Sequence, residues 1–218
     1  MPKPYQLVVF DWEGTLADTL GQIIHIVSRE AKNLGFGEID HDLARKHVEL
    51  GLVRATRKLL PHLSDEQLDL LLNTVQRAMV CKSSDVYLIP GAMAFLTQLQ
   101  HAGVDLAIAS NKSQQTLQRA LQVSQLDTLF KVTRSAGQVP AKPCPQMLEE
   151  IMEEHMVDAA GTLMIGDTVI DVEMAKAAGV DVIGVDFYHQ QEAALLAAGA
   201  NQVFDDYRQL AAYLGFNG

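Results

Sequence analysis

The sequence lacks several features that define whole classes of proteins. Its 218 residues include two cysteines, Cys81 and Cys144, which lie far apart and form no CxxC motif. A disulfide framework needs more cysteines in a shorter chain, so we expect two reduced thiols and a cytoplasmic protein. No apolar run approaches the roughly 18 residues that a membrane-spanning helix needs. The first run, Leu7–Phe10, is also too short for a signal-peptide core, so we expect no membrane partner.

Basic residues are also scarce. The chain has 17 Lys and Arg against 27 Asp and Glu, which gives a formal net charge of −10. This balance argues against a general nucleic-acid-binding protein, which needs many cations to contact phosphates. It leaves a small phosphorylated ligand open, because one local site can bind such a molecule. The seven histidines show no HxH or HExxH spacing, so we expect no histidine metal site.

Six short apolar runs punctuate the sequence, with helical patterns between them. Each run is continuous rather than alternating, which is typical of strands buried on both faces of a parallel sheet. Strands that alternate with helices predict an α/β fold with a doubly wound parallel sheet. The runs span residues 6–10, 104–109, 130–133, 162–165, 181–185 and 202–204, and the third is the weakest.

The connection between the first two runs is unusually long. It takes residues 11–103, whereas a whole βαβ unit takes about 30 residues. The surplus is helical in pattern: Asp18 can cap a helix that ends before Gly35, and a capping-box pattern begins at Ser64. Ligands of open α/β sheets bind beyond the carboxyl ends of the strands, so an insertion there would lie over the site. We therefore predict an α/β catalytic core of residues 1–18 and 88–218, and a helical cap of residues 19–87.

Polar side chains follow the apolar runs at one predicted edge of the sheet. Asp11 follows the first run, Ser110 the second, Lys142 comes after the third, and Asp167 follows the fourth, with Asp171 shortly after. Convergent carboxylates repel one another unless a cation binds them, and oxygen ligands suit Mg²⁺. A lysine and a hydroxyl suit a phosphoryl group. The pattern therefore predicts a magnesium site that binds a phosphorylated molecule.

In these motifs the sequence resembles the haloacid dehalogenase superfamily, in particular its phosphoglycolate-phosphatase-like branch, which carries a helical cap after the first motif. All four family motifs match in order, and they span nearly the whole chain. The resemblance implies a Mg²⁺-dependent phosphatase that acts on a small phosphorylated metabolite. It implies that Asp11 is the nucleophile that forms a phospho-aspartyl intermediate. It further implies that Ser110 and Asn111 hold the transferring phosphoryl group, and that Lys142 neutralises charge.

The same resemblance implies a set of magnesium ligands. Asp167 would bind the metal directly, together with Asp11 and the backbone carbonyl of Glu13. Asp171 would be the acidic partner that orients water bound to the metal. These four residues are therefore the expected metal-binding residues, and Mg²⁺ is the expected cofactor.

One position departs from the family pattern. The first motif is normally DxDGT, and this chain has Glu13 in place of the second aspartate. That aspartate protonates the leaving oxygen and then activates water, which contributes about 10²–10⁴ in rate. Glutamate adds a methylene, and a displacement of about one ångström is enough to matter. Three interpretations stay open: Glu13 does the same work from a shifted position, does it slowly, or inactivates the enzyme. A working or slowed enzyme is favoured, because the other motif residues remain: Asp11, Ser110, Lys142, Asp167 and Asp171.

The predicted cap is slightly basic between Glu38 and His62, although the whole chain is acidic. Arg54 and Arg57 are the candidates in this segment to bind a substrate carboxylate, such as that of phosphoglycolate. The alternative is a solvated helix face with ordinary charge pairs. The choice of phosphate ester, and the choice between monomer and homodimer, stay open at this point.

Other reactions of the same superfamily are alternatives. A phosphomutase returns the phosphoryl group to an isomer, and Glu13 is compatible with that. A carbon–halogen hydrolase does not need the acidic pair Asp167 and Asp171, and a phosphonate hydrolase uses a cap lysine and a small residue in place of Glu13. A receiver-type sensor also phosphorylates an aspartate, but it has no helical insertion after its first strand. A slow Glu13 would still leave a phosphorylated species able to act as a sensor.

Overall fold

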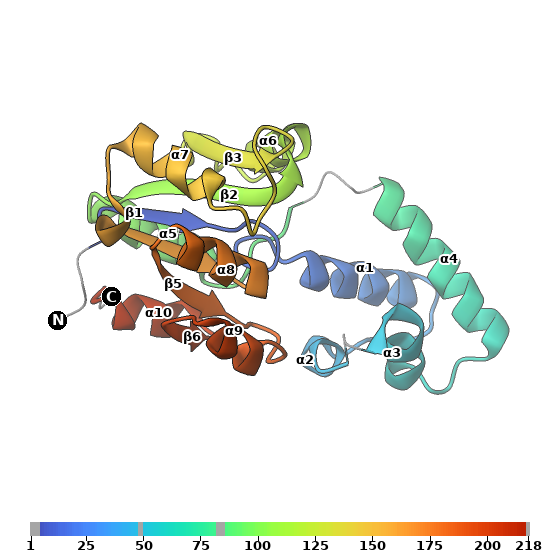
Figure 1. Ribbon diagram of the computed structural model, residues 1–218. Helices are drawn as coiled ribbons and strands as arrows, with labels where there is room; N and C mark the ends of the chain where they lie inside the picture. The colour runs from blue at the N-terminus through green and yellow to red at the C-terminus, as the bar shows by residue number, and fades with distance from the viewer. Residues whose placement is uncertain (1–4, 48–49, 82–85, 217–218) are drawn as a thin grey trace. The chain divides into compact units, whose positions relative to one another are not determined.

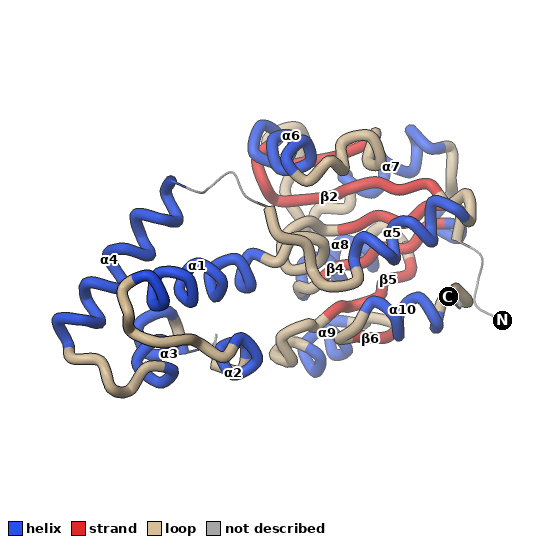
Figure 2. The backbone as a smooth tube through the Cα atoms, turned by 180° about the vertical axis from the view of Figure 1, so that it is seen from behind, coloured by secondary structure: helices blue, strands red, loops and turns tan. Residues whose placement is uncertain are grey.

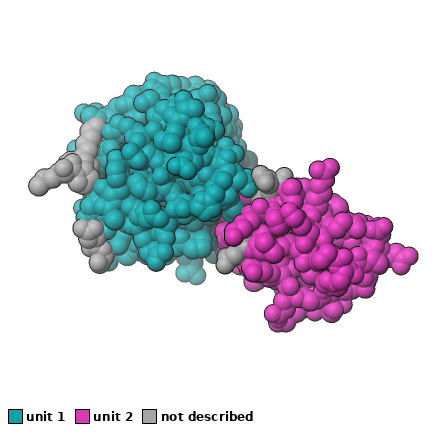
Figure 3. Space-filling model, turned by 90° about the horizontal axis from the view of Figure 1, so that it is seen from below, with its two compact units in different colours: residues 1–17, 88–218 teal, residues 18–87 magenta. Residues whose placement is uncertain are grey.

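The computed structural model of the protein describes residues 5–47, 50–81 and 86–216. The chain forms two compact units, one made of residues 1–17 and 88–218 (unit 1) and the other of residues 18–87 (unit 2) (Figure 3). The second unit begins one residue before the predicted insertion. Within the described ranges, no helix is both long enough and apolar enough to cross a membrane.

Unit 1 is built on one parallel sheet. Its six strands lie in the order β3-β2-β1-β4-β5-β6, and every neighbouring pair is parallel (Figures 1 and 2). This arrangement confirms the predicted doubly wound α/β fold. The strands are β1 (Leu7–Phe10), β2 (Asp105–Ser113), β3 (Val132–Ala136), β4 (Thr162–Gly166), β5 (Asp181–Val185) and β6 (Gln202–Phe204).

Helices cover both faces of this sheet, which explains why the strands are continuously apolar. On one face, Met147, Val172 and Leu195 of three helices share a core with strand residues such as Val9 and Met164. On the other face, the ring of Phe10 contacts those of Phe95 and Phe130, with 6.1 Å between the centroids in each pair. The helices are α5 (Ala92–His101), α6 (Gln114–Val123), α7 (Gln146–His155), α8 (Val169–Ala177), α9 (Glu192–Ala198) and α10 (Tyr207–Tyr213), with a 3₁₀ turn η2 (Ala159–Gly161).

Two strand boundaries differ from the sequence prediction. The second strand was expected to end at residue 109 but continues to Ser113, because its ladder with β3 extends through the Ser110 and Ser135 pair. The third strand was expected at residues 130–133 but begins at Val132, since Phe130 leaves the ladder and packs against Phe10. Polar residues inside a strand and an aromatic residue outside it mislead a prediction based on apolar runs.

The strand order of the sheet indicates where a ligand is expected to bind. The chain moves from β1 outward through β2 and β3, then returns to the other side of β1 and continues through β4, β5 and β6. Ligands of such sheets bind where the strand order reverses, beyond the carboxyl ends of the strands. Here that point lies between β1 and β4, where the backbone N–H of Asp11 donates to the carbonyl of Ile165 over 2.9 Å.

Unit 2 is helical and has its own apolar core, which includes Ile26, Ala31, Leu71 and Val75. The predicted caps are confirmed. The Asp18 carboxylate accepts from the backbone N–H of Gly21 over 2.8 Å, Gly35 has a positive φ of 73° beyond the first helix, and Ser64 and Gln67 bond reciprocally. The helices are α1 (Thr19–Asn33), α2 (His41–Arg45), α3 (Leu52–Leu59) and α4 (Asp65–Cys81). Cys144 of unit 1 is a free thiol, whereas the side chain of Cys81 lies outside the described part of the structure.

Candidate active site

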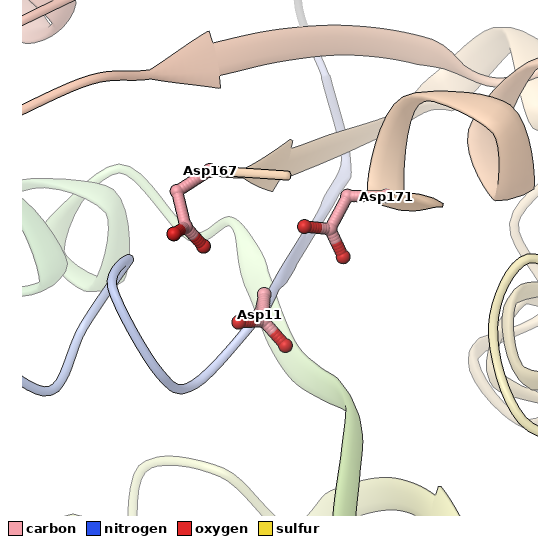
Figure 4. A group of neighbouring side chains, drawn as sticks. All are labelled: Asp11, Asp167 and Asp171. Carbon is pink, nitrogen blue, oxygen red and sulfur yellow. The ribbon is translucent and has the colours of Figure 1, made fainter. Parts of the chain in front are cut away.

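Three carboxylates meet at the carboxyl edge of the sheet. Asp11 follows β1, Asp167 follows β4, and Asp171 lies in the first turn of α8. Each contributes an oxygen atom to a group in which all three oxygens lie within 4.8 Å of one another. Figure 4 shows the three side chains as neighbours, with the carboxyl groups of Asp167 and Asp171 on the side that faces Asp11. The structure thus brings together residues that are more than 150 positions apart in the sequence.

Lys142 enters this group from the loop before α7. Its Nζ atom donates to Oδ1 of Asp11 over 2.5 Å and to Oδ1 of Asp171 over 2.6 Å, and all three residues are buried. Asn111 fixes the lysine from the end of β2, because its Oδ1 accepts from the backbone N–H of Lys142 over 2.8 Å. Asn111 was predicted to hold substrate, and the structure adds this contact with the lysine backbone.

The electrostatics of the group show an excess of negative charge. Burial raises the pKa of Asp11 to about 6, although Lys142 acts in the opposite direction. Burial and the charges of Asp11 and Asp171 raise the pKa of Asp167 to about 8. Burial disfavours the charged form of Lys142, but its two carboxylate partners outweigh that effect and its pKa is raised. With every group ionised, three carboxylates and one ammonium leave two negative charges, which a divalent cation would neutralise.

Hydrogen bonds orient the two acids that follow β4. The second oxygen of Asp171 accepts from both the backbone N–H and the hydroxyl of Thr168, over 3.1 and 2.5 Å. Oδ1 of Asp167 accepts from the Thr15 hydroxyl over 3.1 Å. Asp171 therefore has partners on both oxygens, whereas Asp167 is the less neutralised acid. An all-oxygen group with one under-neutralised carboxylate fits the ligand preference of Mg²⁺.

Two glycines leave room for these acids. Gly14 has a φ of +77°, and a Cβ atom there would lie 2.1 Å from Oδ2 of Asp167. A Cβ atom on Gly166 would lie 2.5 Å from Cβ and Cγ of Asp171. Only a residue without a side chain allows the backbone to approach the carboxylates so closely. Gly14 and Gly166 are therefore part of the site.

Ser110 and Glu13 lie on the same edge. Ser110 is buried within β2, three residues before the strand ends, and its Oγ accepts from the backbone N–H of Lys112 over 3.2 Å. The side chain of Glu13 is 53% exposed, and its Oε1 accepts from Nζ of Lys112 over 2.7 Å. The carboxyl of Glu13 thus lies at the surface of unit 1 while that of Asp11 is buried.

The two candidate arginines belong to α3 of unit 2, and both are exposed. Arg57 pairs with Asp65 over 2.7 Å. Arg54 forms no ion pair among the residues that the structure describes. Within unit 2 the two residues therefore differ in how much of their charge is already compensated.

Sequence reasoning missed two residues that support the site. Thr168 is the N-cap residue of α8, and its hydroxyl donates to Asp171. Tyr207 of α10 was not considered at all: its buried hydroxyl donates to the backbone carbonyl of Thr15 over 2.8 Å. Burial, with the charges of Asp167 and Asp11, raises the pKa of Tyr207 well above its usual value, so the hydroxyl remains a donor. The position of Thr168 directly after Asp167 could have indicated its role from the sequence. No neighbouring residue in the sequence indicates the contact of Tyr207 with Thr15.

Comparisons with known proteins agree with this architecture. A model of the haloacid dehalogenase-like hydrolase family matches residues 8–185. A Dickeya dadantii protein named "Probable phosphatase IndB" is 30% identical over 209 residues, which cover 94% of this chain and 91% of that protein. A phosphoglycolate phosphatase from Synechococcus elongatus is 29% identical over 196 residues, which cover 88% of this chain and 89% of that protein.

Solved structures show the same fold. One is a HAD family hydrolase from Deinococcus radiodurans R1, solved with bound phosphate and sodium, which is 24% identical with a TM-score of 0.67. The match covers 98% of this chain and 96% of the Deinococcus chain. The chain belongs to the haloacid dehalogenase-like hydrolase family, because the family model covers most of its length. It is therefore an enzyme of the hydrolase class.

Proposed function

We propose that the protein is a Mg²⁺-dependent phosphatase that hydrolyses a small phosphorylated metabolite through a phospho-aspartyl intermediate on Asp11. The observation that carries the proposal is the buried group of Asp11, Asp167 and Asp171 with Lys142 bonded to two of its members. Burying this much charge is costly and gives little stability in return. A catalytic role explains why the charges are there.

In the proposed first step, the Asp11 carboxylate attacks the phosphorus of the ester. A phosphorus–oxygen bond to aspartate forms, the bond to the ester oxygen breaks, and Glu13 gives a proton to the departing alcohol. Lys142 holds the nucleophile and offsets charge on the phosphoryl oxygens, while Ser110 and Asn111 hold the phosphoryl group. In the second step, water attacks the phosphoryl group, Glu13 accepts its proton, and the carboxylate of Asp11 is restored with release of phosphate.

The proposed metal ligands are the carboxylates of Asp11 and Asp167 and the backbone carbonyl of Glu13, with Asp171 as the partner that orients coordinated water. When bound, Mg²⁺ neutralises charge on the phosphoryl oxygens. Asp167 must be ionised to serve as a ligand, and its pKa of about 8 falls when a cation binds beside it. The affinity for Mg²⁺ should therefore increase between pH 6 and pH 9.

We propose a phosphoglycolate-like substrate, that is, a small phosphate ester with a carboxylate. Several relatives named phosphoglycolate phosphatase support this choice, among them one from Rhodospirillum rubrum that is 27% identical over 228 residues. In this proposal unit 1 is the catalytic core, unit 2 is the cap, and Arg54 or Arg57 binds the carboxylate.

The test is phosphate release from a panel of phosphorylated metabolites, with and without Mg²⁺, by the wild type and by Asp11→Asn. We expect many turnovers by the wild type with Mg²⁺, and a loss of at least about 10⁴-fold in Asp11→Asn. Release of one alcohol per protein, with the phosphate retained on Asp11, would instead indicate a phospho-aspartate sensor with an impaired Glu13. No release from any ester, or equal release by Asp11→Asn, would contradict the proposal.

A further inference from the structure

Lys112 is a charged residue at the edge of the site. The proposed mechanism assigns no role to it. It lies in the last residues of β2, two positions after Ser110. Its side chain is only 21% exposed, although it carries an ammonium group. The structure shows the Nζ atom donating to Oε1 of Glu13 over 2.7 Å. Lys112 thus joins the strand that carries Ser110 and Asn111 to Glu13, the residue that departs from the family pattern.

The identity of Glu13 makes this contact informative. Glutamate has one more rotatable bond than aspartate, so its carboxyl group is less well fixed by the backbone. The side chain of Glu13 is 53% exposed, so packing does little to hold it. A carboxylate that transfers a proton at a fixed atom must be held within hydrogen-bond reach of that atom. The ammonium of Lys112 supplies a fixed point for the longer side chain.

Lys112 is itself held in place. Its backbone N–H donates to Oγ of Ser110 over 3.2 Å, and its stem is largely covered. The residue proposed to hold the phosphoryl group therefore also fixes the residue that holds Glu13. An ion pair this close to solvent contributes little to stability, so stability is not a sufficient reason for it.

We propose that Lys112 is a positioning residue for Glu13, and that the Lys112–Glu13 pair replaces the single aspartate of the family motif. The inference rests on the proposed phosphatase function and adds to it the residue that makes a glutamate workable at position 13. A competing role for Lys112 is direct attraction of the anionic substrate, which would not depend on the residue at position 13.

A double-mutant cycle separates the two roles. We expect Lys112→Met to lower kcat about ten-fold with little change in KM, and Lys112→Arg to restore kcat to within about three-fold. Asp in place of Glu at position 13 ends one methylene short of Lys112, so in the Glu13→Asp background Lys112→Met should change kcat less than about two-fold. Lys131→Met, at an exposed lysine of unit 1, is the matched control and should leave kcat unchanged. Equal losses in both backgrounds, or a change confined to KM, would overturn the inference.

A second measurement does not depend on turnover. In protein labelled with ¹³C-glutamate, the carboxyl signal of Glu13 can be assigned through its absence in Glu13→Gln. At one fixed pH, we expect this signal to move in Lys112→Met and to stay near its original position in Lys112→Arg and Lys131→Met. If the wild type releases no phosphate, the proposed function fails, yet a moved signal still supports Lys112 as the residue that holds Glu13. An unmoved signal would overturn the inference even in an active enzyme.

Discussion

The two units differ in the charged side chains that they bury and in the partners of those side chains. Unit 1 buries Asp11, Lys142 and Asp171 beside one another at the edge of its sheet. In unit 2, the charged residue that is buried among those described is Asp18, which caps α1 and pairs with Arg45 over 2.9 Å. The buried charge of unit 2 thus has a local structural reason. In unit 1 only Asp171 has one, because it belongs to the capping box of α8, whereas Asp11 and Lys142 have none. Buried charge without a structural reason is the better indicator of a reactive site.

The largest effect that tests this comparison is expected for Lys142→Met. The change leaves two buried carboxylates without their ammonium partner, which should cost about 3–5 kcal/mol in the free energy of unfolding. It should also lower kcat by at least about 10³-fold, because the nucleophile and the phosphoryl group lose their compensating charge. The measurements are urea unfolding without metal and steady-state phosphate release with Mg²⁺.

Arg45→Met in unit 2 is the counterpart of that variant, since it also removes the cation from a buried aspartate. We expect a loss of about 1–2 kcal/mol in stability and no change in kcat, because the Asp18 carboxylate keeps its bond to the Gly21 backbone. If Lys142→Met kept more than a tenth of the wild-type kcat, the buried charges of unit 1 would have to be structural, and the contrast between the units would disappear.

A smaller effect distinguishes two glycines that share one backbone conformation. Gly14 of unit 1 and Gly35 of unit 2 have φ values of +77° and +73°. Substitution by alanine should cost each about 1–2 kcal/mol through backbone strain. Only at Gly14 does the new Cβ meet a carboxylate, that of Asp167, whereas nothing lies within 4 Å of the position at Gly35.

We therefore expect Gly14→Ala to lower kcat about 10–100-fold and to raise the Mg²⁺ concentration required for half-maximal rate, because the Asp167 carboxylate is displaced. Gly35→Ala should change neither quantity by more than about two-fold. Urea unfolding separates the shared strain from the specific effect. Equal kinetic losses in the two variants would show that strain alone accounts for the result.

The sequence was most informative where local chemistry and fold agree. The continuous run Leu7–Phe10 predicted a strand buried on both faces, and Asp11 directly after it had to lie at the carboxyl edge of a parallel sheet. The same reasoning located Asp167 after β4. The caps at Asp18 and Ser64 were predictable because a cap depends on residues within one helical turn.

What the sequence could not predict depends on side chains from distant segments. The hydroxyl of Tyr207 bonds to the carbonyl of Thr15 across 192 positions, and Lys112 bonds to Glu13 across 99. No periodicity or spacing connects such pairs, because the fold alone brings them together. The predicted end of the second strand at residue 109 was wrong for a related reason: Ser110 continues β2 because Ser135 lies beside it in β3. The pairing of Ser110 with Ser135 keeps both residues in strands although their side chains are polar.

The smallest expected effect concerns the exposed charges of unit 2. If Arg54 binds the substrate carboxylate, Arg54→Met should raise KM for a carboxylated phosphate ester about 3–10-fold with kcat little changed, because an exposed ion pair contributes about 1 kcal/mol. Arg57 is already paired with Asp65, so Arg57→Met should raise KM less than about two-fold. An ester without the carboxylate, such as ethyl phosphate, is the control and should show no change in either variant. A larger effect of Arg57→Met would reverse the assignment. Equal increases in KM for both esters would show that the arginines act through general attraction of anions, and that the acidic group of unit 1 alone defines the site.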